Sequence, residues 1–364
     1  MYLQDNNNSR EIDYNEKWGY INVHPGAFTF WWLFYSNGQT DPSRPLILWI
    51  QGGPGSSGCG YGNFQEIGPL DQYLNPRNTT WLQKADLLFI DNPVGTGFSY
   101  VESQSALTAN SKEIARDLLV FAKAWFNIHI DYRNRPFYIF SESYGGKMST
   151  AFVSLLYPAI QKGEVQCNFK GYAMGDSWIS PIDYITSWGD YLYYFNYFSQ
   201  SDLNKYNALA NTCQNYVNNG LWLNATKCYD YTDPLINQLS DGVSWYNVLK
   251  RRSTDPLSLT DIYRFHHHHK TAETGKKVVQ PVGDQWDDII DVLMNGKMRK
   301  KFGIIPKNWR FHDASDIVFE TQKFDFMTPV VKKVDELLTK GYPFKIVIYQ
   351  GQVDLICCTV GTNL

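Results

Sequence analysis

One segment constrains the fold of this chain more than any other: an apolar strand that turns directly into an amphipathic helix, with a serine at the turn. The strand is expected over residues 137–140 and the helix over residues 147–162, so Ser143 lies between them. A serine hydroxyl is a weak nucleophile at neutral pH and needs exposure together with a neighbouring base. A tight strand-to-helix turn supplies the exposure, and the helix N-terminus supplies positive potential and free N–H groups. The segment therefore predicts a nucleophilic serine.

The residues around this serine are close to the Gly-x-Ser-x-Gly pattern of a nucleophile elbow. They read Ser141-Glu142-Ser143-Tyr144-Gly145, with serine in place of the first glycine. Gly145 and Gly146 would let the helix pack close to the sheet. The alternative is an ordinary strand–helix loop in which the serine caps the helix. The strand before the turn and the helix after it favour the elbow.

A glycine-rich loop lies farther upstream. It follows an apolar strand expected over residues 46–50 and reads Gln51-Gly52-Gly53-Pro54-Gly55-Ser56-Ser57-Gly58. Acyl transfer develops negative charge on a carbonyl oxygen, and two preorganised backbone N–H groups are its usual stabiliser. In α/β-hydrolases one donor follows the nucleophile and the other comes from a loop after an earlier strand, which assigns these roles to Tyr144 and Gly53. A phosphate-binding loop is the other interpretation, but no Gly-Lys-Ser/Thr follows.

Strands and helices alternate from residue 18 to about residue 180, which favours an α/β fold with a mostly parallel central sheet and helices on both faces. The remaining elements expected here are strands at 28–35, 87–90 and 170–174 and a helix at 111–126. From residue 181 the pattern changes to helical stretches rich in Tyr, Asn and Trp, which we interpret as a helical cap inserted over the active site. The sheet is expected to resume near Lys345.

We therefore expect an α/β-hydrolase fold whose C-terminal end is truncated. Its sections are a flexible N-terminus, the first part of the core, the helical cap, and an incomplete second part of the core, at residues 1–17, 18–180, 181–290 and 291–364. With 364 residues and 43% hydrophobic content, the chain has ample material for one large core.

Four segments together resemble the serine carboxypeptidase family. They are Trp49–Ser57, Glu66–Pro69, Asp91–Tyr100 and Glu142–Gly146. The resemblance runs from about Trp18 to the last residue and is loosest between roughly 190 and 290. It implies that Ser143 is the nucleophile, that Gly53 and Tyr144 are the oxyanion-hole donors, and that no cofactor or metal takes part.

The resemblance also implies a site for the terminal carboxylate of a peptide. Gln51 stands where many members have asparagine, beside Gly52, and Glu66 and Glu142 match a pair of carboxyl groups that faces the same site. Two glutamates and a substrate carboxylate cannot all stay ionised in one pocket, so one should hold a proton and favour activity at acid pH. The alternative for both glutamates is that they are ordinary surface acids.

Asp354 matches the aspartate of the catalytic triad, since it follows an apolar strand and a glycine turn and the order Ser…Asp suits this fold. The histidine of that order should come after Asp354, but residues 355–364 contain none. Removing the histidine from a well-studied triad costs about six orders of magnitude in turnover. We expect this chain to be an incomplete gene model or a truncated isoform, and to be nearly inactive.

The other histidines offer no replacement base, because all seven lie upstream of Asp354. We expect His24 and His129 on surface strands or loops and His312 in a polar stretch. The run at residues 266–269 is expected in a solvated loop, with adventitious metal binding as the alternative.

Composition limits the partners and the compartment. A net charge of −3 without a basic stripe argues against nucleic acid, and the apolar run at 28–35 is too short to span a membrane. No signal peptide is visible at the N-terminus. Sequons nevertheless occur at Asn7, Asn78 and Asn224. Because the family is made in the secretory pathway, we expect a lysosomal, vacuolar or extracellular protein, with the cytosol as the alternative.

Six cysteines are present, and all-bridged pairing would allow fifteen connectivities. Cys213 and Cys228 fall in one polar segment and could form a disulfide. The adjacent Cys357 and Cys358 are expected to pack rather than to pair with each other.

The function that these sequence features favour is release of C-terminal residues from peptides or proteins through an acyl-enzyme on Ser143. An acyltransferase or esterase on the same scaffold is the first alternative, and a non-catalytic relative is the second. The carboxylate-binding set favours the peptidase.

Overall fold

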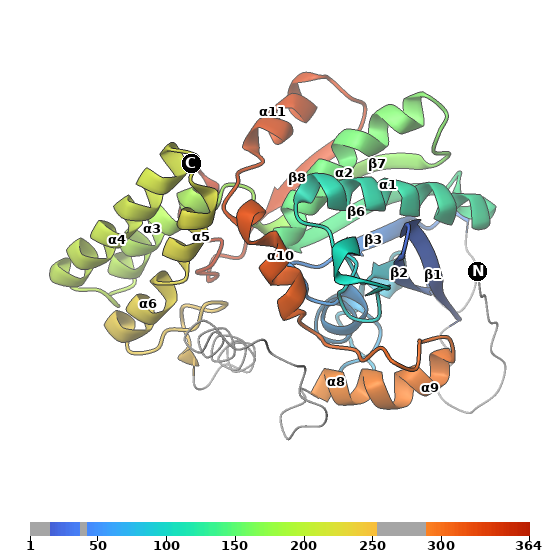
Figure 1. Ribbon diagram of the computed structural model, residues 1–364, viewed down its shortest axis with the longest axis horizontal. Coiled ribbons are helices and arrows are strands. Elements are labelled where there is room, and N and C mark those ends of the chain that lie inside the picture. Colours follow the sequence, from blue (N-terminus) through green and yellow to red (C-terminus); the bar gives the residue numbers. More distant parts are fainter. Residues whose placement is uncertain (1–14, 37–41, 253–288) are drawn as a thin grey trace. The chain divides into compact units, whose positions relative to one another are not determined.

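The computed structural model describes residues 15–36, 42–252 and 289–364, and Figure 1 shows how its helices and strands are arranged. The chain divides into two compact units. The first unit is Met1–Ser177, Ile289–Gln322 and Val330–Ile348; the second is Trp178–Asp288, Lys323–Pro329 and Tyr349–Leu364. The helical section expected from residue 181 falls in the second unit, and so does the C-terminal segment that carries Asp354. Its role as a cap stays a prediction.

The first unit is built on an eight-stranded sheet in the order β1-β2-β4-β3-β6-β7-β8, with β5 paired to β2. The pairs β4–β3, β3–β6 and β6–β7 are parallel, whereas β1–β2, β2–β4 and β2–β5 are antiparallel. The strands are β1 (Glu16–His24), β2 (Ala27–Phe34), β3 (Leu46–Ile50), β4 (Asp86–Ile90), β5 (Tyr100–Val101), β6 (Pro136–Ser143), β7 (Asn168–Ser177) and β8 (Lys345–Tyr349). This mixed, mostly parallel sheet is that of the α/β-hydrolase fold.

Helices cover both faces of this sheet. Those of the first unit include the π-helices η2 (Gly58–Ile67) and η7 (Met294–Met298), α1 (Ser111–Ile128), α2 (Tyr144–Gln161), α8 (Ile289–Leu293), α9 (Arg299–Phe302), most of α10 (Asp316–Phe326), and α11 (Val331–Thr339). Figure 1 shows α1 and α2 side by side; α2 packs over β6 and β7, and α1 packs against β1. Those of the second unit are α3 (Pro181–Tyr194), α4 (Gln200–Asn218), α5 (Trp222–Tyr229), α6 (Thr232–Ser240) and α12 (Thr359–Thr362).

Adjacent tryptophans on β2 show how the two faces are filled, because successive side chains of a strand point to opposite sides. The Trp31 ring packs edge-on against Trp125 of α1, with centroids 6.3 Å apart. The Trp32 ring packs instead against Phe64 of η2 at 6.0 Å and Phe302 of α9 at 4.8 Å. The α1 side and the η2–α9 side thus have separate aromatic cores.

The strands and helices expected in the first unit are present, but most extend farther than the sequence pattern indicates. β1, η2 and the helices from α8 to α11 were not anticipated, and β1 includes the last two residues of the N-terminal stretch expected to be flexible. The prediction that His129 lies at the surface is wrong. Because α1 continues to Ile128, His129 stacks on Trp125 at 4.3 Å and is only 5% exposed. This burial lowers the pKa of His129.

The second unit has an aromatic core of its own. Trp178 stacks on Tyr184 at 5.4 Å, and Trp188 packs edge-on against Trp245 at 4.9 Å. A disulfide joins Cys213 of α4 to Cys228 of α5, as the polar segment indicated. Two further cysteines of this unit are buried and take no part in that disulfide, also as expected: Cys357 and Cys358.

Some sequence features fall outside the described residues, namely the histidine run at 266–269 and the sequon at Asn7. The other two sequon asparagines, Asn78 and Asn224, are exposed. None of the described helices is both long enough and apolar enough to cross a membrane.

Candidate active site

The structure places Ser143 at the junction between β6 and α2, where the chain reverses from strand to helix. Its backbone has φ 55° and ψ −128°, a conformation that a residue with a side chain adopts only under strain. The helix starts close to the sheet because Gly145 has no side chain: a Cβ there would lie 2.4 Å from the carbonyl oxygen of Ile50. Ser143 therefore sits on a strained elbow whose geometry depends on a nearby glycine.

The glycine-rich loop after β3 packs directly against the elbow. A Cβ on Gly52 would lie 2.6 Å from the Cβ of Ser143 and 3.1 Å from its Oγ. The next residue, Gly53, has φ 104°, in the region that favours glycine. This close approach puts the backbone after Gly52 and the first residue of α2, Tyr144, on either side of the serine. These are the two predicted sources of oxyanion-hole N–H groups.

A buried carboxylate at the end of β4 fixes the far end of this loop. Asp91 accepts hydrogen bonds from the Ser57 hydroxyl at 2.5 Å and from the backbone N–H groups of Cys59 and Phe98 at 3.1 and 2.8 Å. Burial raises the pKa of Asp91 to about 6 despite these donors. Asp91 lies in one of the four segments that resemble the family, but this role was not predicted for it; its position directly after a buried strand is the signal that could have indicated the role.

A second contact to the loop comes from a segment far along the chain. The Ser57 N–H donates to the carbonyl of Asp313 at 2.8 Å, and the Ser315 N–H donates to the carbonyl of Gly55 at 2.9 Å. Nothing in the local sequence of the loop indicates this pairing, because the partner segment lies more than 250 residues away. The loop is therefore held from both sides.

Gln51 brings the two predicted glutamates together beside the elbow. The Trp49 indole N–H donates to Gln51 Oε1 at 2.6 Å, which turns the amide nitrogen the other way. That nitrogen donates to Glu66 Oε1 at 3.2 Å and to Glu142 Oε2 at 3.3 Å. Glu142 precedes Ser143 directly, so the cluster lies next to the serine. The interpretation of these glutamates as ordinary surface acids does not fit this arrangement.

The electrostatics of the cluster favour a proton on one carboxyl group. Burial and then the neighbouring charge of Glu142 raise the pKa of Glu66 well above its ordinary value. Glu66 Oε2 is inaccessible to solvent and has no hydrogen-bond partner among the described residues. Because both carboxyl groups accept from the same Gln51 amide nitrogen, they lie close together, and the raised pKa favours a proton on Glu66.

Asp354 belongs to the second unit. Its carboxylate is buried and accepts hydrogen bonds from the N–H groups of Cys357 at 2.9 Å and Ile356 at 3.2 Å. The Gln350 amide lies 3.5 Å from the same carboxylate. The structure thus shows a carboxylate held by its own turn, while its role in a triad stays a prediction.

The three histidines within the described residues have partners away from Ser143. His24 Nδ1 lies 2.8 Å from Asp117 Oδ1, and His312 Nδ1 lies 3.5 Å from Asp291 Oδ2. His129 is stacked between aromatic rings in the core. None of the three is placed as a base for the serine.

A serine on a strained strand-to-helix elbow, faced by a glycine-rich loop on a mostly parallel sheet, defines the α/β-hydrolase class. Comparison with known proteins narrows the class. The profile of the serine carboxypeptidase family matches residues 7–364, and the chain belongs to this family.

Two relatives illustrate the similarity. The chain is 43% identical over 348 residues to the human retinoid-inducible serine carboxypeptidase, covering 95% of this chain and 75% of that protein. It is 41% identical over 361 residues to serine carboxypeptidase-like 51 of Arabidopsis thaliana, covering 96% and 78%. Among solved structures, the Saccharomyces cerevisiae prohormone-processing carboxypeptidase Kex1 superimposes with a TM-score of 0.74 at 20% identity, covering 95% of this chain and 75% of that one. This last likeness supports the fold.

Proposed function

We propose that this protein is a serine carboxypeptidase that releases C-terminal residues from peptides or proteins through an acyl-enzyme on Ser143. The observation that carries the proposal is the Gln51 amide, which donates to both Glu66 and Glu142 immediately beside the elbow serine. A group of one amide and two carboxyls that share a proton can bind a further carboxylate by hydrogen bonds. A peptide held by its free C-terminus there would present its last amide bond to Ser143.

The bond changes follow from this placement. The Ser143 oxygen attacks the last peptide carbonyl, its proton passes to a general base and then to the departing amino group, and the C-terminal amino acid leaves. Backbone N–H groups of Gly53 and Tyr144 would stabilise the oxyanion, a contribution worth about 3 kcal/mol per donor in comparable sites. Water then hydrolyses the ester on Ser143 by the reverse proton transfers.

The base is the component that the 364 residues do not supply in the usual place, since no histidine follows Asp354. We expect these 364 residues by themselves to turn over substrate about six orders of magnitude more slowly than an enzyme with an intact triad. Measurable hydrolysis by the 364-residue chain that Ser143→Ala abolishes would contradict this expectation.

The test of the function uses the enzyme expressed from its complete transcript. Blocked peptides with a free C-terminus are compared with the same peptides amidated at the C-terminus, and release of the last residue is measured. A carboxypeptidase should cleave the first set and lose the second. Equal cleavage of both sets, or transfer of an acyl group to an alcohol in place of water, would support the acyltransferase or esterase alternative. No turnover of any substrate would support a non-catalytic relative.

We also propose that the protein passes through the secretory pathway. The Cys213–Cys228 disulfide and the exposure of Asn78 and Asn224 within their sequons support this route, because disulfides persist in oxidising compartments. Treatment of the native protein with an N-glycosidase should lower its apparent mass. An unchanged mass together with reduced Cys213 and Cys228 would favour the cytosol.

A further inference from the structure

The turn that carries Asp354 is bound along its backbone by another part of the second unit, the loop at residues 243–252. Two consecutive N–H groups, those of Leu355 and Ile356, donate to the single carbonyl oxygen of Trp245 at 3.0 and 3.3 Å. In the opposite direction, the Val248 N–H donates to the carbonyl of Val353 at 2.8 Å. These bonds lie on both sides of Asp354, so the loop fixes the path of the chain through that residue.

Helix α3 adds two contacts to the same turn. The Trp188 indole N–H donates to the carbonyl of Ile356 at 3.0 Å, and the Tyr191 hydroxyl donates to the carbonyl of Gln352 at 2.8 Å. Trp188 also packs edge-on against Trp245. The Trp245 carbonyl therefore holds two N–H groups of the turn, and its ring packs against Trp188, the side chain that binds a third group there.

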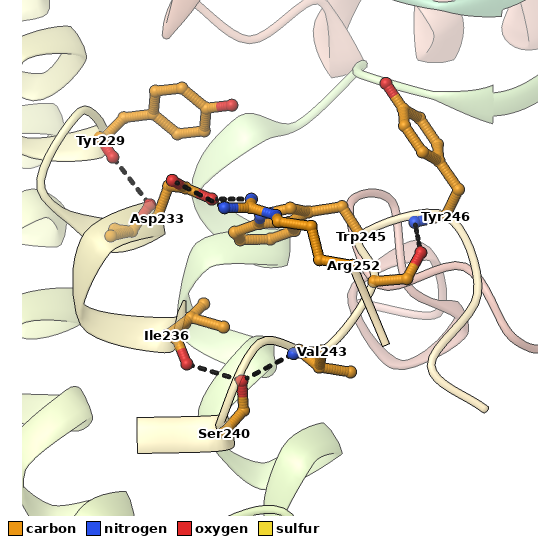
Figure 2. A network of polar contacts seen from close by, with 10 residues as sticks. Tyr229, Asp233, Ile236, Ser240, Val243, Trp245, Tyr246 and Arg252 are labelled. Atoms are coloured by element: carbon orange, nitrogen blue, oxygen red, sulfur yellow. Dashed lines mark hydrogen bonds and ion pairs between the residues drawn. The ribbon is translucent and has the colours of Figure 1, made fainter. Parts of the chain in front are cut away.

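Trp245 is in turn fixed by a buried ion pair, which Figure 2 shows. Its indole N–H and one guanidinium nitrogen of Arg252 both donate to Asp233 Oδ1, and the second terminal nitrogen of Arg252 lies 3.4 Å from Oδ2. Asp233 is 6% exposed and Arg252 is 8% exposed. A carboxylate this deep requires its partner, since a lone buried charge is strongly destabilising.

The same loop is closed at its base, which makes it a rigid connection. The Arg252 N–H donates to the carbonyl of Gly242 at 2.7 Å, and the Val243 N–H donates to the Ser240 hydroxyl at 3.1 Å. Arg251 donates to the carbonyl of Ser240 from the outside at 2.6 Å. With its ends fixed, the loop has little freedom to absorb a change at Asp233 or Arg252 other than by moving Trp245.

We propose that the buried pair of Asp233 and Arg252 is a positioning device for Asp354, acting through Trp245. Asp233, Trp245 and Arg252 are positioning residues, and none of them is proposed to touch substrate. The effect of this device on catalysis rests on the proposed function, in which Asp354 is the triad aspartate. Its effect on the position of the turn does not depend on that function and is tested separately.

Two buried thiols report on the turn without any need for activity. Cys357, whose N–H donates to Asp354, is 1% exposed, and Cys358 is 0% exposed. Cys59, buried in the first unit at 0% exposure, reports on opening of that unit. The rate at which a maleimide labels each thiol in the native 364-residue chain is followed by peptide mass spectrometry.

Arg252→Met should speed labelling of Cys357 and Cys358 by about tenfold or more and leave Cys59 unchanged, because the unpaired Asp233 frees the loop. Trp245→Phe, which removes one hydrogen bond without leaving a charge unpaired, should give a smaller rise at the same two thiols. Arg252→Lys keeps the charge and should restore much of the protection.

The matched control breaks the buried ion pair of the first unit. In that pair a terminal guanidinium nitrogen of Arg135 lies 2.7 Å from a carboxylate oxygen of Asp86, and the two side chains are 3% and 0% exposed, respectively. Arg135→Met should expose Cys59 rather than Cys357 and Cys358. The proposal is overturned if Arg252→Met and Trp245→Phe leave Cys357 and Cys358 as protected as before. It is equally overturned if all three thiols open together, since the pair would then stabilise the chain without positioning the turn.

A kinetic measurement on the enzyme from the complete transcript tests whether the positioning of Asp354 affects catalysis. Trp245→Phe should lower kcat with KM nearly unchanged, because the triad is disturbed and the carboxylate site is not. A rise in KM with unchanged kcat would contradict positioning. If the unmodified enzyme has no carboxypeptidase activity, the proposed function fails while the labelling result stands independently.

Discussion

In the first unit, Ser143 is held by the chain on either side of it and by one glycine loop. In the second unit, Asp354 is held through the backbone of its turn by residues that are remote in sequence. The elbow needs only the β6–α2 junction and close packing at Gly52 and Gly145. The aspartate turn needs α3 and the loop at 243–252, and its bond to Trp188 joins residues 168 positions apart. One region is a local motif and the other is a product of tertiary structure.

This difference changes how each region can fail. A substitution at the elbow acts on the serine directly, because the affected atoms touch it. At the turn, a substitution in α6 or in the loop at 243–252 acts on Asp354 through several hydrogen bonds and without contact. Damage to the aspartate can therefore arise from residues that a motif search would never select.

The largest expected effect is that of Ser143→Ala in the enzyme from the complete transcript. Loss of the nucleophile should lower kcat by about a millionfold, since the remaining machinery then has no group to acylate. Ser154→Ala, on the next turns of α2, is the control and should leave kcat unchanged. Activity that survives Ser143→Ala would mean that the elbow is not the reaction centre.

The second prediction concerns the disulfide of the second unit, which closes a loop of 15 residues. Replacing Cys213 and Cys228 by serine should lower the free energy of unfolding by about 3 kcal/mol, more than a hundredfold in the equilibrium constant. Urea unfolding with hydrogen exchange should place the loss in α4 and α5. Cys167→Ser, at a free cysteine, is the control. An equal loss in the first unit would mean that the two regions are not separate in stability.

The third prediction is local to the elbow. Gly145→Ala puts a Cβ 2.4 Å from the carbonyl oxygen of Ile50, which must push α2 and Ser143 away from the sheet. A displacement of about 1 Å at a reacting atom can cost a hundredfold in rate, so kcat/KM should fall by about that factor. Gly296→Ala meets no atom within 4 Å and is the control. An unchanged kcat/KM would show that the elbow tolerates more movement than its close packing indicates.

The smallest expected effect is the pH dependence of substrate binding. Because the pKa of Glu66 is raised, its proton is held at acid pH and is lost as the pH rises. Under the proposed function two carboxylates would then face the carboxylate of the substrate, so KM for a peptide with a free C-terminus should increase by about tenfold, or 1.4 kcal/mol, as the pH rises through the pKa of Glu66. Glu66→Gln should flatten this profile. An identical pH profile in the variant would remove Glu66 from the substrate site.

The sequence predicts the local elbow better than the turn that depends on tertiary contacts. The elbow and the glycine loop were predictable, because strand-turn-helix geometry and glycine packing depend on contiguous residues. The family resemblance added Gln51, Glu66, Glu142 and Asp354. Hydrogen bonds between distant segments, such as the one from the Ser57 N–H to the Asp313 carbonyl, leave no periodic pattern in the sequence of either segment. His129 was misplaced for a related reason: a polar residue just past a predicted helix end reads as surface until the packing of Trp125 is known.

The contacts that hold the Asp354 turn have one more consequence, for how the turn can evolve. Trp188, Tyr191 and Val248 all donate to backbone carbonyl oxygens, those of Ile356, Gln352 and Val353. Every residue type offers the same carbonyl, so mutation at these three acceptor positions leaves the donors satisfied. The side chains of the turn, and with them the surroundings of Asp354, can therefore change in evolution while the hydrogen bonds that hold the turn remain. The donor side has no such freedom at Trp188 and Tyr191, where the side chain itself makes the bond.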